Sequence, residues 1–215
     1  MTNMSSTITK LEAVFDALND EFFGGKLPKP MLTIQSTPRA YGHCSTKKIW
    51  VAGEDGRYEI NIGAEYLSRP TENTCATLLH EMVHLYCLEN DIKDTSQGGR
   101  YHNGNFKKEA EARQLSISYD STIGWSVTAP TDAFRETLTR LGISWQIDFA
   151  RELPVSRRAK GPMPGAADPN DPNANPDPEK PKYKGYRCPK CDQTIRTMKE
   201  LFLMCGLCKV DMERF

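Results

Sequence analysis

The sequence predicts a mixed α+β domain, then a proline-rich linker and a small C-terminal module built around a metal. Three observations lead to this interpretation: short strand-like segments lie between amphipathic helical patterns, the composition changes at Pro154, and two Cys-x-x-Cys pairs close the chain. With 215 residues, of which 38% are hydrophobic, the chain can build one medium domain with a packed core and one small appendage. We therefore divide it into residues 1–153, 154–182 and 183–215.

The first domain opens with a helix and a β-rich stretch. Apolar residues keep helical spacing over 8–22. Ser6 or Thr7 can cap this helix, and Gly24 ends it. Turn residues separate the strand-like segments that follow, which we expect to form a small antiparallel sheet: residues 31–36, 39–44, 48–51 and 57–62.

Three further helices are expected in the rest of this domain. The longest opens at Pro70-Thr71 and runs to about Asn90. A second begins at Asn103, which can cap it, and continues through Leu115. The last starts at Thr131 or Asp132 and ends near Gly142.

The longest of these helices contains the segment His80-Glu81-Met82-Val83-His84. At 100° per residue, the two histidines and Glu81 share one face, and apolar residues fill the opposite face. Two imidazoles four residues apart can bind one metal ion, and the glutamate between them is placed to hold a water against it. We therefore predict a zinc peptidase in which Glu81 takes the proton of the water and delivers it to the leaving amine. The alternative is a helix with two unpartnered histidines on its polar face.

A catalytic zinc needs a third protein ligand, and only His43 and His102 remain as histidine candidates. We prefer His102, because it follows a polar loop and directly precedes a helix, so that it can fold back over His80 and His84. His43 lies in an expected strand, where we predict a structural or surface role.

Substrate contacts are also expected near this site. The strand Tyr58–Ile62 precedes the zinc-site helix, and its edge can pair with the backbone of an extended peptide. Such pairing would bind peptides with little sequence preference. Tyr101 and Tyr119 are candidates for a second donor to the oxyanion.

The linker is defined by its composition. Residues 154–182 hold eight of the fourteen prolines and almost no apolar side chains. Such a segment cannot bury enough apolar surface to offset the entropy lost on ordering. We expect an extended, flexible tether.

The C-terminal module carries two cysteine pairs: Cys188, Cys191, Cys205 and Cys208. Thirteen residues separate the pairs, which is the spacing of a four-cysteine structural zinc site. The module is too short for a core of its own, so the metal would supply its folding energy. A redox disulfide is the alternative for either pair alone. We expect structural roles for the other cysteines, Cys44, Cys75 and Cys87.

The same module is basic. From Lys182 to Phe215 it has eight basic and four acidic side chains, whereas the formal net charge of the whole chain is zero. Cations contact phosphates, and the interleaved aromatic rings can stack on bases. We predict DNA binding by six of its cations: Lys182, Lys184, Arg187, Lys190, Arg196 and Lys199. The alternative is a zinc ribbon that contacts protein or only stabilises the C-terminus.

The composition also indicates in which cellular compartment the protein is expected. Residues 1–10 lack the apolar core of a secretory signal, and no apolar run is long enough to span a bilayer. Cysteine pairs suited to a metal favour a reducing environment. We expect a cytoplasmic protein without membrane association.

Taken together, these motifs resemble the SprT-like metallopeptidases, relatives of the Spartan DNA–protein crosslink protease. The resemblance rests on the four-cysteine ribbon and on four segments: Leu18-Asn19-Asp20-Glu21-Phe22-Phe23-Gly24-Gly25-Lys26-Leu27-Pro28, Gly42-His43-Cys44, Thr77-Leu78-Leu79-His80-Glu81-Met82-Val83-His84 and His102-x-x-x-Phe106. It covers about residues 8–125 and 183–215. In this combination the motifs are specific.

The resemblance implies a zincin-like mixed α+β domain with a catalytic zinc on His80, His84 and His102 and with Glu81 as catalytic residue. It also implies cleavage of DNA-bound or DNA-crosslinked proteins, with DNA as activator and a role in DNA repair. The chain departs from the family pattern at Asn103, where many members have glycine, and in the length of its linker. Two functions compete: a regulatory metallopeptidase that cleaves one repressor-type protein, and a non-catalytic nucleic-acid-binding zinc protein, which would have no use for Glu81.

Overall fold

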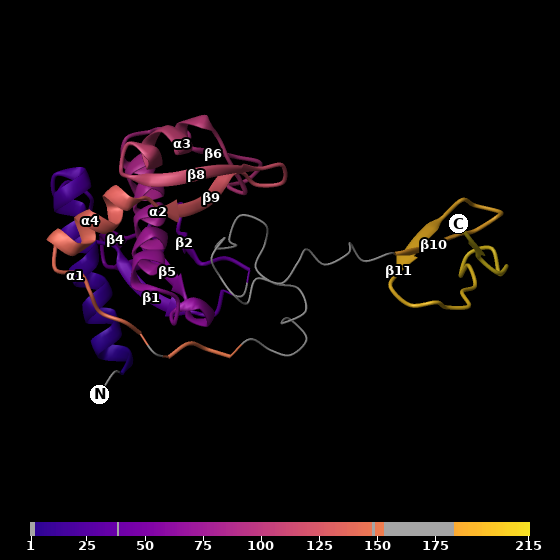
Figure 1. The fold of residues 1–215 in the computed structure, drawn as a ribbon. Coiled ribbons are helices and arrows are strands. Elements are labelled where there is room, and N and C mark those ends of the chain that lie inside the picture. Colours follow the sequence, from indigo (N-terminus) through magenta and orange to yellow (C-terminus); the bar gives the residue numbers. More distant parts are fainter. Residues whose placement is uncertain (1–2, 38, 148, 153–182) are drawn as a thin grey trace. The chain divides into compact units, whose positions relative to one another are not determined.

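The computed structural model describes residues 3–37, 39–147, 149–152 and 183–215 (Figure 1). The chain divides into two compact units, Met1–Asp177 and Pro178–Phe215. The predicted linker lies outside the described residues, so its flexibility and the two domain boundaries stay predictions. Among the helices of the described chain, none combines the length and the apolar character needed to cross a membrane.

Helix α1 (Met4–Phe23) opens the first unit. Asn3 caps it, because its side chain accepts a hydrogen bond from the Ser6 N–H at 2.8 Å while the Ser6 hydroxyl accepts one from the Asn3 N–H. The predicted caps at Ser6 and Thr7 are therefore wrong. The predicted end is confirmed, since Gly24 has the left-handed conformation with φ 61°.

Three strands form the first sheet, in the order β1-β5-β2: β1 (Met31–Gln35), β2 (Gly42–Cys44) and β5 (Glu59–Gly63). β5 runs parallel to β1 and antiparallel to β2, so the sheet is mixed and the prediction of an antiparallel sheet is wrong. All five residues of β5 are buried between two partner strands. The predicted peptide-binding edge at Tyr58–Ile62 is therefore wrong as well, because the central strand has no edge to offer. The edge next to α2 belongs to β2.

Between β2 and β5 the chain forms a separate hairpin of β3 (Trp50–Ala52) and β4 (Asp55–Arg57). The segment predicted at 57–62 thus divides between β4 and β5. Neither hairpin strand pairs with another strand of the described chain.

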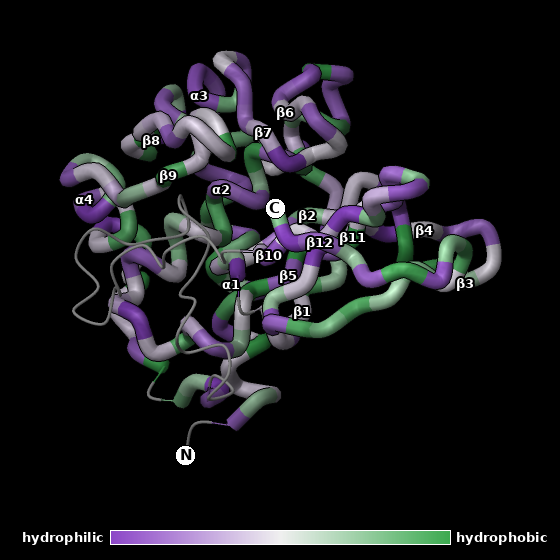
Figure 2. The backbone as a smooth tube through the Cα atoms, turned by 90° about the vertical axis from the view of Figure 1, so that its right-hand side faces the viewer, coloured by the Kyte–Doolittle hydropathy of each residue, from purple (hydrophilic) through white to green (hydrophobic). Residues whose placement is uncertain are grey.

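Helix α2 (Thr71–Glu89) follows the short 3-10 helix η1 (Ala64–Tyr66) and runs through the middle of the first unit (Figure 1). Its apolar face is fully buried, as the helical wheel predicts: Leu78, Leu79, Met82 and Val83. Cys75 and Cys87 lie in the same core, where burial raises the pKa of each thiol to about 12. The tube view shows hydrophobic stretches through the middle of the first unit (Figure 2), where α2 contacts β5.

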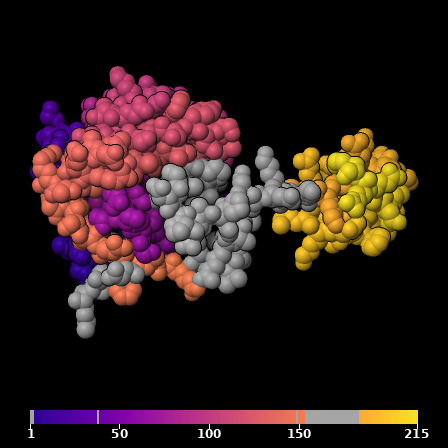
Figure 3. All heavy atoms as spheres, viewed as in Figure 1, coloured from indigo at the N-terminus to yellow at the C-terminus, as the bar shows by residue number. Residues whose placement is uncertain are grey.

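A second sheet has the order β6-β7-β9-β8, from β6 (Thr95–Ser96), β7 (Tyr101–His102), β8 (Leu115–Asp120) and β9 (Gly124–Pro130). Helix α3 (Gly104–Glu111) lies between β7 and β8 in the chain, and Asn103 caps it as predicted. It ends before Leu115, where β8 begins. The sequence pattern does not predict the hairpin of β8 and β9. With α3 it forms a continuous layer at the top of the unit (Figure 3).

Helix α4 (Asp132–Arg140) completes the first unit, and Thr131 caps it. The second unit is a small antiparallel sheet of order β11-β10-β12, from β10 (Lys184–Arg187), β11 (Thr194–Thr197) and β12 (Glu213–Arg214). Two cysteine-bearing turns adjoin this sheet.

Candidate metal centres

The structure brings together the three histidines that the sequence selects. His80 and His84 lie on α2, and His102 ends β7. Their Nε2 atoms are separated by 3.2 Å between His80 and His84, 3.3 Å between His80 and His102, and 3.0 Å between His84 and His102. Phe106 packs against all three rings, with centroid distances of 4.5 to 4.7 Å. The prediction that His102 folds back over the α2 face is confirmed.

Hydrogen bonds at the opposite ring nitrogens fix two of the tautomers. The Nδ1 of His84 lies 2.5 Å from a carboxylate oxygen of Asp94, which can only accept a proton from it. The Nδ1 of His80 lies 2.7 Å from the hydroxyl of Thr128, whose own proton goes to the Ser126 carbonyl. Both Nε2 atoms therefore keep their lone pairs directed at the common centre.

His102 is held differently. Its backbone N–H donates to the Ile123 carbonyl at 2.9 Å, which holds the backbone of His102 at the end of β7. Its Nδ1 is buried without a hydrogen bond of ordinary geometry in the described chain. Burial, followed by the charge of His84, lowers the pKa of His102 to about 4, so the ring is neutral at physiological pH.

This arrangement fits a zinc ion. Tetrahedral ligation with Zn–N bonds near 2.0–2.1 Å places ligand nitrogens about 3.3 Å apart, close to the separations found here. Three lone pairs that face one another at this distance repel unless a cation lies between them. Burial also lowers the pKa of His80 well below its usual range, which keeps the ring available as a ligand.

Glu81 lies beside the same centre. Its side chain is buried, and its carboxylate accepts a hydrogen bond from the Cys44 backbone N–H of β2. Burial raises the pKa of Glu81 to about 7, although the neighbouring His84 and the hydrogen bond from Cys44 act in the opposite direction. A carboxylate with this pKa can both accept and return a proton near neutral pH.

A cavity of about 340 Å³ exposes this cluster. The segment from Arg39 to Cys44 forms one wall, α2 contributes His80, Glu81 and His84, and residues of the 94–102 segment and of β9 close the other side. Its wall thus includes the edge strand β2. His43 is exposed on this wall, with Nε2 3.4 Å from a carboxylate oxygen of Glu59, and is not part of the metal cluster, in keeping with its predicted surface role.

Tyr101 and Tyr119 do not line the cavity. Their hydroxyl groups lie 3.0 Å apart and hydrogen-bond to each other. The described geometry therefore gives no support to either as an oxyanion donor.

Sequence reasoning missed the side chains that orient the histidines. The sequence predicts only a polar loop around Asp94, and it does not predict the strand on which Thr128 lies. An acidic residue between the second and third histidines was the only available signal, and the sequence holds several.

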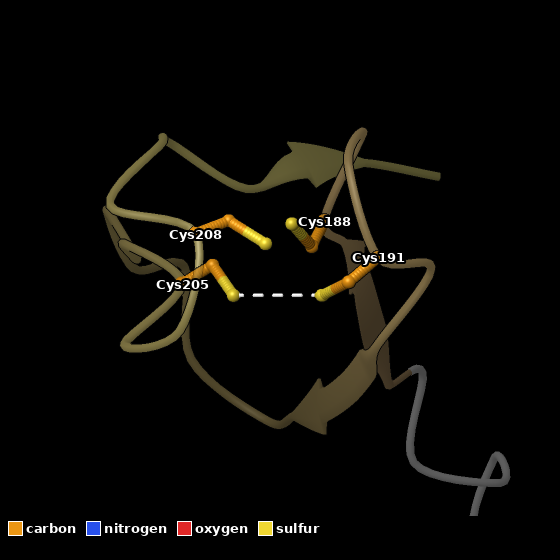
Figure 4. A group of neighbouring side chains, drawn as sticks. All are labelled: Cys188, Cys191, Cys205 and Cys208. Carbon is orange, nitrogen blue, oxygen red and sulfur yellow. Dashed lines mark hydrogen bonds between the residues drawn. The ribbon is translucent and has the colours of Figure 1, made fainter.

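The second cluster is in the C-terminal unit (Figure 4). The sulfur atoms of Cys188, Cys191, Cys205 and Cys208 all lie within 4.8 Å of one another. Cys191 and Cys205 are 3.7 Å apart, close to the about 3.8 Å expected between sulfurs around a tetrahedral zinc. In both turns the residue after the second cysteine, Asp192 or Lys209, has a positive φ, so the two turns have matching backbones.

The chemistry of these thiols also favours a cation. Backbone N–H groups of Cys208 and Leu207 lower the pKa of Cys205 to about 7, so this sulfur ionises readily. The hydrogen bond with Cys191 raises the pKa of Cys208 to about 12. Four thiolates can coexist in one cluster only if a metal neutralises them.

The predicted DNA-binding cations fall into two groups. Lys184 is paired with Glu200 at 2.8 Å, and Arg187 lies over the Phe215 ring. Lys190, Arg196 and Lys199 are exposed on the module. Lys182 lies outside the described residues.

Comparisons with known proteins agree with this site. The sequence model of the SprT-like family matches residues 11–122, which include all three histidines and Glu81. A Salmonella typhimurium protein, described as uncharacterised and in the mucB 3′ region, is 31% identical over 55 residues, which cover 26% of this chain and 72% of that protein.

Proposed function

Because the chain belongs to the SprT-like family, we propose that it is a zinc-dependent endopeptidase with its active site on α2. The observation that carries this proposal is the convergence of three imidazoles beside the buried carboxylate of Glu81, in one open cavity. A purely structural zinc site has no use for such a glutamate.

His80, His84 and His102 would hold the zinc, with Asp94 and Thr128 orienting two of the rings. Zinc, when bound, would polarise the scissile carbonyl and make an attacking water more acidic. The carboxylate of Glu81 takes the proton of the attacking water and then delivers it to the leaving amine. The Cys44 N–H keeps this carboxylate in place through both transfers.

Substrate binding is assigned to β2. This strand is the edge of its sheet and lines the cavity, so the backbone of an extended peptide can pair with it beside Glu81. Pairing through backbone hydrogen bonds depends little on the side chains of the peptide. A peptidase of this kind needs another device to choose its substrates.

We further propose that this device is the C-terminal unit, which would hold a structural zinc and bind DNA. Its exposed cations and aromatic rings support DNA binding, and the tether would let one bound site reach many proteins. The enzyme would then cleave proteins bound or crosslinked to DNA, as the SprT-like resemblance implies, in a cytoplasmic setting.

The test is cleavage of a basic DNA-binding protein with and without single-stranded DNA, beside the variant Glu81→Gln. DNA-stimulated cleavage that disappears in Glu81→Gln is the expected result. Cleavage that ignores DNA would leave a peptidase of the regulatory type. Absence of cleavage with zinc bound at both centres would leave a non-catalytic zinc protein.

A further inference from the structure

Two arginines line the cavity beside the histidine cluster, one on each side. Arg39 begins the segment that forms one wall, and Arg100 belongs to the 94–102 segment on the other side. Both residues are exposed. In the part of the chain that the structure describes, neither guanidinium has an ion-pair or hydrogen-bond partner, whereas Arg113 and Arg135 each pair with an acidic side chain. Two cations of one cavity are therefore available to a ligand.

The positions of the two arginines in the chain explain why both reach the cavity. Arg100 comes two residues before His102, and side chains two residues apart on an extended chain point to the same side. Tyr101, between them, does not line the cavity. Arg39 comes three residues before Gly42, the first residue of β2, and so lies at most about 11 Å from it. A peptide paired with β2 would therefore carry side chains past both arginines within about three residues of its scissile bond.

The carboxylates of the cavity are already engaged. Among the described residues that line it, only Glu81 and Asp94 are acidic. They are 5% and 8% exposed. Asp94 is hydrogen-bonded to the Nδ1 of His84, and Glu81 to the backbone N–H of Cys44. A substrate chain in the cavity therefore meets two accessible cations, and both carboxylates lie buried behind the wall.

The location of these cations favours a carboxylate of the substrate over a phosphate of DNA. A peptide must enter the cavity before its carbonyl can reach Glu81, so its side chains pass the arginines on every productive encounter. The cavity, of about 340 Å³, has the size of a pocket for a small ligand or a few residues. A DNA strand could reach the arginines only by taking the place of the peptide. The planar guanidinium also matches a carboxylate, to which it can donate two parallel hydrogen bonds.

We propose that Arg39 and Arg100 are specificity-determining residues, which bind an acidic side chain of the protein substrate within about three residues of the scissile bond. This proposal rests on the proposed peptidase function, and it defines the substrate class as protein segments that contain aspartate or glutamate. Such segments suit an enzyme that works beside DNA. Phosphates repel them, so the acidic segments of a DNA-bound protein stay away from the nucleic acid and can enter the cavity.

Cleavage of matched peptide pools is the first test. The pools share random positions drawn from uncharged residues and differ in one fixed central residue, which is glutamate, glutamine or lysine. Zinc-loaded wild-type enzyme should show a kcat/KM about tenfold higher for the glutamate pool than for the glutamine pool, as expected for charge-assisted hydrogen bonds. Mass spectrometry should place the cut bonds within about three residues of the glutamate.

Variants assign this preference to the two arginines. In Arg39→Gln/Arg100→Gln the ratio of the glutamate to the glutamine pool should fall to about one, because the charge-assisted hydrogen bonds are lost. Arg39→Glu/Arg100→Glu should prefer the lysine pool, a gain that misfolding cannot produce. The control Arg57→Gln/Arg140→Gln removes two exposed arginines that do not line the cavity, and it should keep the wild-type ratio. An equal ratio in the cavity and control variants would overturn the proposal. So would a cavity variant that keeps the ratio and loses affinity for a single-stranded oligonucleotide.

Binding separates this proposal from the peptidase function. Zinc-loaded Glu81→Gln is titrated with fluorescent versions of the same pools, alone and combined with Arg39→Gln/Arg100→Gln. If wild-type enzyme cleaves no pool while Glu81→Gln binds the glutamate pool more tightly and the combined variant does not, the peptidase function fails and the carboxylate site stands. If wild-type enzyme cleaves the glutamate and glutamine pools equally well, the carboxylate site fails and the peptidase function stands. Absence of both cleavage and a binding difference would overturn both.

Discussion

Gly42 on β2 lies directly against the side chain of Glu81. A Cβ atom at this position would come within 3.1 Å of a carboxylate oxygen of Glu81 and within 2.8 Å of the Asn61 carbonyl oxygen. The second distance is shorter than real Cβ contacts allow, and the obstacle is backbone of the central strand β5. Glycine at this position therefore lets β2 approach α2 closely enough for its backbone to hold the glutamate.

Gly42→Ala should consequently displace Glu81 or push β2 away from β5. We expect a loss of about 1–3 kcal/mol in the free energy of unfolding, as for other overpacked sites, and a fall in kcat greater than the change in KM. Gly104→Ala is the matched control, because a Cβ there meets nothing within 4 Å. Thermal unfolding and peptidase kinetics on both variants would check this, and wild-type activity in Gly42→Ala would contradict it.

Asp94→Asn should weaken zinc binding at the histidine cluster without removing a ligand. The carboxylate accepts a hydrogen bond from the Nδ1–H of His84 and fixes the orientation of the ring. Loss of such a partner typically costs about 10–100-fold in metal affinity. Competition with a chromophoric chelator would measure it, with Asp132→Asn on the surface of α4 as the control. An unchanged zinc affinity would mean that Asp94 plays no part in ordering the site.

Asp94 is a site residue that local sequence patterns could not identify. Helices α1 and α2 and the histidine pair were predictable because their signals are local: apolar spacing, a terminal glycine and residues four apart on one face. Asp94 and Thr128 meet the histidines only through the packing of the second sheet on α2. No local pattern distinguishes Asp94 from other acidic residues in loops.

The sheets were harder still. All five residues of β5 are buried, so its alternation of apolar and polar side chains did not reveal that it is the central strand. Asn61 is polar yet buried, because its side chain accepts hydrogen bonds from the Gln35 N–H and the Thr33 hydroxyl of β1. The β8–β9 hairpin is rich in serine and threonine, which weakens the usual contrast between its faces. Strand order depends on contacts between residues that lie far apart in the sequence, and no local pattern reveals such contacts.

Zinc content should separate the two centres. We expect two zinc ions per chain by elemental analysis and one in Cys205→Ser. Structural zinc supplies about 10–16 kcal/mol of binding energy in small modules, so this variant should lose the fold of residues 183–215. Limited proteolysis should then degrade the module and leave the first unit intact. Two zinc ions in Cys205→Ser would show that the cysteine cluster is not a metal site.

Glu65 should contribute to stability in a pH-dependent way. Burial by itself raises the pKa of Glu65, but hydrogen bonds from the Ser36 hydroxyl and the Thr37 N–H, together with Arg151, outweigh it and lower the pKa. A carboxyl with a lower pKa in the folded state stabilises the protein above its unfolded pKa, and this contribution disappears as the pH falls through the folded pKa. Wild-type protein should therefore lose more stability than Glu65→Gln on acidification. Urea midpoints across the acid range would measure this, beside the exposed control Glu136→Gln, and parallel curves would contradict it.

DNA affinity should depend on the exposed cations of the C-terminal unit rather than on all of its basic residues. Lys184 and Arg214 both pair with Glu200 at 2.8 Å, so they have less charge to offer a phosphate than Lys190 and Lys199. Each phosphate contact to a single strand contributes about 0.7 to the slope of log affinity against log salt. Lys190→Ala/Lys199→Ala should thus reduce that slope by about 1.4. Lys26→Ala/Lys108→Ala, which removes two exposed lysines of the first unit, should leave it unchanged. An equal slope in the two double variants would place the DNA contacts elsewhere, and an absence of DNA binding by wild-type protein would leave the ribbon as a structural or protein-binding module.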